Sequence, residues 1–441
     1  MNAPRLGSEE VSYSDRISHL PDDLLLRILS FIPTSDAISR SLLSKRWKFL
    51  WMMMPTLDLD EDSCRNLDSL RFDEVCCSFL QSHEARVLTS LNLKLMTHSN
   101  DIDRLLSNIQ SILHELTITS YSWSRISFPR NLNVCQTLVV MKLQDKVLVD
   151  VFSPPVCFRS LKTLHLTRVK YSCRESFRRL LSVCPVLEDL YLFIDRVRNE
   201  CLRSFTIFVP SLQRLSICEE SYINSSTTLF EISVPSLIYL KIAARYGWFK
   251  FFEDMPKLVE AHVEVRPYEF NNLLRCLTSV ERLSIEFFSS MDIDLTDRIF
   301  HRLLYLELHM HNGLQENQIL SLLKHSPNLQ ALKLNEKPSC SVRDQPRFVP
   351  KPNSVPECLT FHLETLEWRG YAGRPEDKEI AVYILGNALR LNMAKISRYF
   401  SSSRFRHRNH QKKDRKIVKE LKSLSKASTS CQLVIQRQYY P

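Results

Sequence analysis

A short pattern, L-x-x-L-x-L with other apolar residues tolerated at the leucine positions, recurs through the middle of this 441-residue chain. It begins at residues 88, 113, 138, 161, 187, 212, 237, 258, 280, 303 and 329, and again at 363 after a longer gap. Up to residue 329, successive starts lie 21 to 26 residues apart. Such a period predicts a solenoid, in which each repeat adds one strand and buries its apolar face against its neighbours.

Both the period and the core pattern are typical of leucine-rich repeats. The Asn or Cys that usually follows the last leucine by three residues is largely missing, and Val169 occupies one such position. The internal hydrogen-bonded ladder of regular repeats is therefore not expected, and the sequence leaves the curvature of the solenoid open.

Each repeat core also predicts which side chains point outward. Side chains alternate along a strand, so the last two leucines of a core point inward and the residue between them points outward. Adjacent repeats should place these outward residues about 5 Å apart. The predicted row is His165, Tyr191, Ser216, Lys241, His262, Ser284, Glu307 and Lys333. We predict that this surface binds a protein substrate, with candidate contacts His165, Tyr191, Lys241, His262, Glu307 and Lys333; the alternative is a solvated face without a partner.

The amino-terminal stretch 17–51 carries three short helix signals. Apolar residues at steps of three and four predict one wide apolar face on the first helix; they are Leu20, Leu24, Leu25, Ile28, Leu29 and Ile32. Pro21 suits its first position and Pro33 ends it. Ser35 or Asp36 can cap a second helix with Ile38, Leu42 and Leu43, and Ser44 a third over 45–51. Some 35 residues are too few to bury this much hydrocarbon, so a partner is expected to cover it.

The segments LPDDLLLRILSFIP and LLSKRWKFLW closely resemble the F-box. The resemblance implies docking on the Skp-type adaptor of a cullin-based ubiquitin ligase, and through that adaptor on cullin. The bland alternative is an ordinary helical hairpin at the start of a domain. The resemblance implies adaptor contact, or support of the contacting face, by Leu20, Pro21, Leu24, Leu25, Ile28, Leu29, Leu42, Leu43, Lys45, Arg46, Trp47 and Trp51.

The carboxyl-terminal part begins after residues 337–356, whose five prolines predict an extended connector. EDKEIAVYILGNALRL has a helical period with Arg390 near its end, IVKELKSLSK predicts a second helix, and CQLVIQ a closing strand. This block resembles, over roughly 355–435, the FBD domain that follows leucine-rich repeats in a large plant family of F-box proteins. The resemblance implies no defined chemistry.

The net charge of +10 is concentrated in one place. Residues 404–426 hold ten basic and two acidic side chains, a net +8. The insert RFRHRNHQKKDRK at 404–416 has three interpretations: a nuclear-import signal, a phosphate-binding patch, or, as we favour, a solvated charged loop. No aromatic residue beyond Phe405 supports stacking on single-stranded nucleic acid, so a nucleic-acid partner is not favoured.

Sequence signals of catalysis are missing. The six glycines form no phosphate-binding motif, no nucleophile elbow occurs, and His309/His311 and His407/His410 lack further ligands at zinc spacing. No cofactor or metal is therefore expected, and we predict a non-catalytic adaptor. Thirteen cysteines without C-x-x-C pairs favour a reduced compartment, the cytoplasm and/or the nucleus. No apolar run is long enough to span a membrane, and no secretory signal precedes the first helix.

The predicted fold class is α/β: a small all-α F-box unit, a leucine-rich-repeat solenoid, and an α+β carboxyl-terminal FBD block. The predicted boundaries are an amino-terminal tail at 1–14, the F-box at 15–60, the repeats at 61–336, the Pro-rich connector at 337–354 and the FBD domain at 355–435. The predicted function is the substrate-recognition subunit of a Skp–cullin–F-box ubiquitin ligase, recruiting an unknown protein. The alternative is a leucine-rich-repeat scaffold that feeds no ligase.

Overall fold

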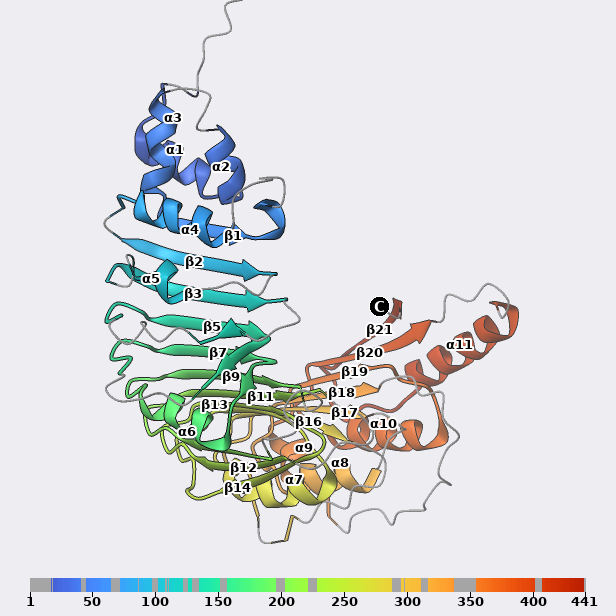
Figure 1. The fold of residues 1–441 in the computed structure, drawn as a ribbon. Helices are drawn as coiled ribbons and strands as arrows, with labels where there is room; N and C mark the ends of the chain where they lie inside the picture. Colours follow the sequence, from blue (N-terminus) through green and yellow to red (C-terminus); the bar gives the residue numbers. More distant parts are fainter. Residues whose placement is uncertain are drawn as a thin grey trace, which may run out of the picture. The chain divides into compact units, whose positions relative to one another are not determined.

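The fold is that of a computed structural model, shown in Figure 1. It describes residues 17, 19–40, 45–64, 72–85, 87–96, 102–107, 109, 111–121, 126–128, 135–150, 157–195, 203–220, 228–287, 295–296, 298–310, 316–336, 354–400 and 407–439. The chain divides into two compact units, each described by itself below. The first comprises residues 1–148 and 153–161, and the second residues 149–152 and 162–441.

Unit 1 opens with the three predicted helices, α1 (Asp22–Leu29), α2 (Thr34–Arg40) and α3 (Lys45–Leu50), followed by the 3-10 turn η2 (Trp51–Met53). Two predicted starts are wrong by a residue or two. Pro21 is the residue before α1, because its ψ of 151° is extended while its carbonyl accepts the N–H groups of Leu24 and Leu25. The second helix already begins at Thr34, so neither Ser35 nor Asp36 caps it.

The strands of unit 1 form a parallel sheet. Its order is β1 (Thr56–Asp60), β2 (Leu88–Leu95), β3 (Leu113–Ser120) and β5 (Val140–Asp145). The connections hold η3 (Asp62–Cys64), α4 (Phe72–Gln81), α5 (Ile102–Leu106), and the paired short strands β4 (Ile126–Ser127) and β6 (Val147–Val149). Strand β1 was not predicted. Its TLDLD sequence alternates in the same way but keeps only two leucines of the repeat pattern, and both are buried.

Unit 2 contains eleven parallel strands that pair in chain order (Figure 1). They are β7 (Thr163–Thr167), β9 (Asp189–Ile194), β11 (Arg214–Glu219), β13 (Tyr239–Ala243), β15 (Glu260–Glu264), β16 (Arg282–Phe287), β17 (Tyr305–Met310), β18 (Ala331–Glu336), β19 (Thr365–Arg369), β20 (Met393–Phe400) and β21 (Gln432–Tyr439). The paired leucines are buried as predicted; Leu190 and Leu215, for example, are wholly inaccessible to solvent. The solenoid prediction is confirmed.

A second layer packs against the side of these strands that carries the buried leucines. It consists of β8 (Lys170–Tyr171), α6 (Arg174–Ser182), β10 (Ser204–Phe208), β12 (Thr228–Ser233), β14 (Gly247–Phe251), α7 (Pro267–Leu273), η5 (Leu274–Leu277), α8 (Glu316–Lys324) and α9 (Glu357–Phe361). Strands β10, β12 and β14 form a small parallel sheet of their own. Its buried rings stack from Phe205 to Phe230 and on to Phe249, with centroids 5.5 and 4.9 Å apart. Aromatic stacking thus contributes to the core of these three repeats.

The carboxyl-terminal block holds α10 (Pro375–Asn387) and α11 (His407–Lys422), and its strands β19, β20 and β21 continue the large sheet. Two predictions need correction. Helix α10 ends at Asn387, because Ala388 is extended with ψ 92°, so Arg390 follows the helix. From His407 onward the basic insert is helical and is not a loop, since Ile417 and Leu421 anchor one buried face of α11 and the preceding Lys, Arg and Gln residues favour helix. Residues 404–406 and most of the connector, 337–353, lie outside the described residues.

Among the described residues, no helix is both long and apolar enough to cross a membrane.

Candidate protein-binding surfaces

The first surface is built on the helices of unit 1. Leu25 and Leu29 point inward on α1 and are buried, together with Ala37 of α2, Leu50 of α3 and Met54. This small core holds the three helices together.

The other side of α1 leaves large apolar side chains in solvent. Leu24, Ile28 and Phe31 follow one another at steps of four and three, and all are exposed, Phe31 by 79%. Phe49 and Met53, also four residues apart, are exposed on α3 and η2. These five residues define the amino-terminal apolar face. Exposed patches of large apolar side chains mark binding sites for other proteins.

A polar clamp fixes α3 against the start of α1. The Arg46 side chain donates from Nε to Asp22 Oδ1 at 2.8 Å and from Nη2 to the Leu20 carbonyl at 2.5 Å. Asp22 also lies in the first turn of α1, where a carboxylate complements the helix dipole. Arg46 therefore orients the helix that carries Leu24 and Ile28.

The residues implied by the F-box resemblance occupy three kinds of position. Leu24, Ile28 and Pro21 are exposed; Leu20, Trp47 and Trp51 are half-buried; Leu25 and Leu29 are core residues that support the face. Leu42, Leu43 and the side chain of Lys45 lie outside the described residues. Sequence reasoning missed Phe31, Phe49 and Met53, although their helical spacing to the other apolar residues was available as a signal.

The second surface is the outward side of the unit 2 strands, here called the strand face. The predicted row forms as expected: in the strand register His165 neighbours Tyr191, and the row continues through Ser216, Lys241, His262, Ser284, Glu307 and Lys333. The structure extends it with Glu367 and Lys395, which sequence reasoning missed. We call this the central row. That it binds a substrate stays a prediction.

Aromatic and charged contacts order the central row. The rings of His165 and Tyr191 lie 5.4 Å apart between centroids. His262 Nε2 lies 2.8 Å from Glu260 Oε1 on its own strand. Burial, together with the neighbouring Cys218, raises the pKa of Tyr191.

Glu307 is the most heavily contacted carboxylate of the central row. Its oxygens lie 2.7 Å from Lys333 Nζ, 3.3 Å from His309 Nε2, 2.9 Å from the Tyr305 hydroxyl and 2.5 Å from Asn335 Nδ2. The hydrogen bond with His309, reinforced by Lys333 and Tyr305, holds the pKa of Glu307 well below its usual range although its side chain is largely buried. Burial, together with the hydrogen bond to Glu307, raises the pKa of Tyr305 to about 12. This network fixes β17 to β18 and leaves Glu307 ionised.

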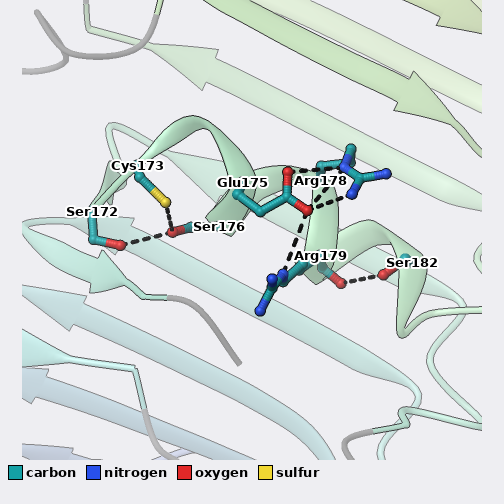
Figure 2. Close-up of polar contacts among 7 residues, drawn as sticks. All are labelled: Ser172, Cys173, Glu175, Ser176, Arg178, Arg179 and Ser182. Atoms are coloured by element: carbon teal, nitrogen blue, oxygen red, sulfur yellow. Dashed lines mark hydrogen bonds and ion pairs between the residues drawn. The ribbon is translucent and has the colours of Figure 1, made fainter. Parts of the chain in front are cut away.

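A polar cluster lies at helix α6 (Figure 2). The Cys173 thiol and the Ser176 hydroxyl share a hydrogen bond of 3.3 Å, which lowers the pKa of the thiol, and Glu175 pairs with Arg178 and Arg179. Cys173 is the N-cap residue of α6, and Ser176 also shares a 2.7 Å hydrogen bond with Ser172. Figure 2 shows the thiol beside the Ser176 hydroxyl, whereas the Glu175 carboxylate points toward Arg178 and Arg179.

Within the described part of the chain, no group of three His, Cys, Asp or Glu side chains is arranged to hold a metal ion. The side chains of His407 and His410 lie outside that part.

Comparison with known proteins bears on both surfaces. Residues 17–58 match the F-box domain, residues 102–243 match the leucine-rich repeats of the FBD-associated F-box protein At5g56370, and residues 351–396 match FBD. The chain is 79% identical over 438 residues to the putative FBD-associated F-box protein At5g56820 of Arabidopsis thaliana, covering 99% of this chain and 98% of the relative. The chain belongs to the plant F-box/FBD/LRR-repeat family.

More distant members of the F-box/FBD/LRR-repeat family match along nearly the same length. The putative F-box/FBD/LRR-repeat protein At5g56810 is 50% identical, with 99% of this chain and all of the relative covered, and the F-box/FBD/LRR-repeat protein At5g56420 is 36% identical, with 96% and 99% covered. Both relatives are from Arabidopsis thaliana. The F-box match contains α1, α2 and α3, the helices that carry the amino-terminal apolar face. F-box proteins typically are substrate receptors of Skp–cullin–F-box ligases, and the F-box generally binds the Skp1 adaptor.

Proposed function

We propose that this protein is the substrate-recognition subunit of a Skp–cullin–F-box ubiquitin ligase. The amino-terminal apolar face binds the Skp-type adaptor, and the strand face binds the protein to be ubiquitinated. The observation that carries the proposal is the exposed line of Leu24 and Ile28 on α1 and Phe31 in the turn after it, all inside the F-box match. Burial of these side chains by a partner removes apolar surface from water, which favours association.

The proposed contribution to ubiquitination is proximity. A receptor that holds a target beside a ubiquitin-charged enzyme raises the effective concentration of the target's lysines without supplying a catalytic group. The thirteen cysteines, an odd number without C-x-x-C spacing, support a reduced compartment, and we propose the cytoplasm and/or the nucleus.

Co-expression with a Skp-type adaptor and cullin tests the adaptor half of the proposal. The variant carries Leu24→Glu and Ile28→Glu, two exposed positions where a carboxylate is tolerated by the free protein but is buried without a partner in the complex. The matched control is Leu389→Glu, an exposed apolar position in unit 2.

The wild type and the control should both retain adaptor and cullin on an affinity column, and the double variant should lose both. Equal retention by all three proteins, or none by the wild type, contradicts the proposal. A wild type that captures a plant protein through the strand face but no adaptor would instead support a scaffold outside the ligase.

A further inference from the structure

A repeated order of side chains runs along the strand face two residues before the central row. In the strand register the order is Asp189, Arg214, Tyr239, followed by Glu260, Arg282, Tyr305. An acid, an arginine and a tyrosine thus occur twice in succession on six adjacent strands. We call this the acid–Arg–Tyr row.

The two arginines have the same local geometry. The Arg214 guanidinium carbon lies 4.3 Å from the centroid of the Tyr239 ring, and that of Arg282 lies 4.2 Å from the centroid of Tyr305. Stacking on an aromatic ring fixes the plane of a guanidinium and leaves its N–H edge available for hydrogen bonds. Both arginines are exposed to solvent, Arg214 by 55% of its side chain.

The neighbouring acids satisfy these arginines only weakly. Asp189 Oδ2 lies 3.8 Å from Arg214 Nε, beyond hydrogen-bond length. Glu260, which precedes Arg282 in the row, lies 2.8 Å from His262 Nε2. Each arginine therefore presents a held, solvent-facing set of donors that suits a carboxylate from a partner.

The spacing of the arginines defines the shape of that partner. Arg214 on β11 and Arg282 on β16 are separated by three inter-strand steps, which at about 4.8 Å each amount to ~14 Å. An extended peptide advances about 3.4 Å per residue, so four residues cover the same distance. Residues i and i+4 of an extended peptide also lie on the same side of it, because its side chains alternate.

From this geometry we propose that the acid–Arg–Tyr row binds an extended segment of the target that carries two acidic residues four positions apart. One carboxylate pairs with Arg214 and the other with Arg282, and residue i+2 lies midway, between Tyr239 and Glu260, where an uncharged side chain fits. The inference rests on the proposed function, because it takes the strand face as the target-binding surface, and it names the class of target segment.

The occupant is a carboxylate segment and not a doubly charged phosphopeptide, because each arginine has an acid beside it in the row. A phosphate carries about −1.5 to −2 charges at neutral pH, and because Asp189 and Glu260 balance the charges of Arg214 and Arg282, its additional charge gains no net attraction from the row.

Labelled twelve-residue peptides titrated into the full-length protein test the inference. The peptides contain two Asp residues two to seven positions apart in an uncharged Ser/Thr background with one Leu between them. Binding should be tightest when the second Asp is four positions after the first. Arg214→Gln and Arg282→Gln should each weaken that peptide roughly ten-fold, the loss of one charge-assisted contact. The matched control, Arg178→Gln on α6, removes an exposed arginine outside the strand face and should change nothing.

Binding that is independent of spacing overturns the inference with the wild-type protein alone, so no variant needs to fold for the test to count. Ten-fold tighter binding by a phosphoserine pair at the same spacing also overturns it. Adaptor binding is measured on the same preparations. Normal adaptor binding with no spacing preference rejects only the acidic segment, whereas a spacing preference without adaptor binding rejects the ligase role and keeps the segment.

Discussion

Phe31 offers the sharpest test of the amino-terminal apolar face, because its side chain is 79% exposed and contributes little to the fold. The change is Phe31→Ala. A phenylalanine can bury about 200 Å², so a partner that covers the exposed part removes ~160 Å² from water. At about 25 cal/mol per Å² this amounts to ~4 kcal/mol.

Two corrections reduce that figure. Alanine keeps its β-carbon and so retains part of the area, and ordering one side chain in an interface costs about 0.5–1.5 kcal/mol. A net loss of about 2 kcal/mol remains, which corresponds to a ~30-fold increase in the Kd for the adaptor. The free energy of unfolding should change by less than about 0.5 kcal/mol, as for most exposed positions.

Isothermal titration of purified adaptor into the wild type and the variant measures the effect, and urea unfolding measures the stability. Phe361→Ala is the matched control, because Phe361 is a 54% exposed phenylalanine at the end of α9 in unit 2. A Kd for Phe31→Ala within two-fold of the wild type, with unfolding unchanged, would remove Phe31 from the interface. An equal loss with Phe361→Ala would refute the assignment of the interface to this face.

The remaining predictions concern stability. Leu25→Ala should lower the free energy of unfolding by about 2–5 kcal/mol in urea titrations, because the Leu25 side chain of α1 is fully buried. A loss under about 1 kcal/mol would contradict that packing. Gly373→Ala should lower the melting temperature, because Gly373 has φ +74° and an added Cβ would lie 2.6 Å from Ile417, whereas Gly386→Ala within α10, where a Cβ meets no atom within 4 Å, should raise stability by about 0.5–1 kcal/mol. Glu307 has a folded pKa below its ordinary value of 4.5, so its contribution is present above about pH 4.5 and is lost as the pH falls through the folded value. The stability difference between wild type and Glu307→Gln in chemical unfolding should therefore shrink from pH 6 to pH 3, and a constant difference would show that His309 and Lys333 do not hold the carboxylate in its charged form.

The repeat pattern predicted most of the fold because residues close together in sequence determine the strand of each repeat. Two leucines with one residue between them fix a strand, its inward side and its register, and Glu307 accordingly lies beside Lys333. Strands β10, β12 and β14 were not predicted, since five or six residues such as SFTIF carry too short a period to distinguish a strand from the helix that usually fills this part of a repeat.

The candidate surfaces were predicted less completely for a different reason. An apolar period identifies a buried or bound face but not which of its members the fold itself covers. Leu25 and Leu29 are covered, whereas Phe31 and Phe49 are not, and only packing decides between them. The arginines of the acid–Arg–Tyr row were missed because their partners Tyr239 and Tyr305 are more than 20 residues away in sequence and are brought together only by the sheet.

The pairing of β18 with β19, and of β19 through β20 to β21, has a consequence for how members of this family can exchange parts. The FBD match starts at residue 351, yet Trp368 of β19 is fully buried beside Leu334 of β18 in the same sheet. In a chimaera that joins the repeats of one relative to the FBD of another, the side chains of β18 and β19 must therefore still pack together across that joint. Exchange in the connections between earlier strands, with the last repeat and the FBD kept together, preserves that joint and lengthens or shortens each row of the strand face by one residue per repeat.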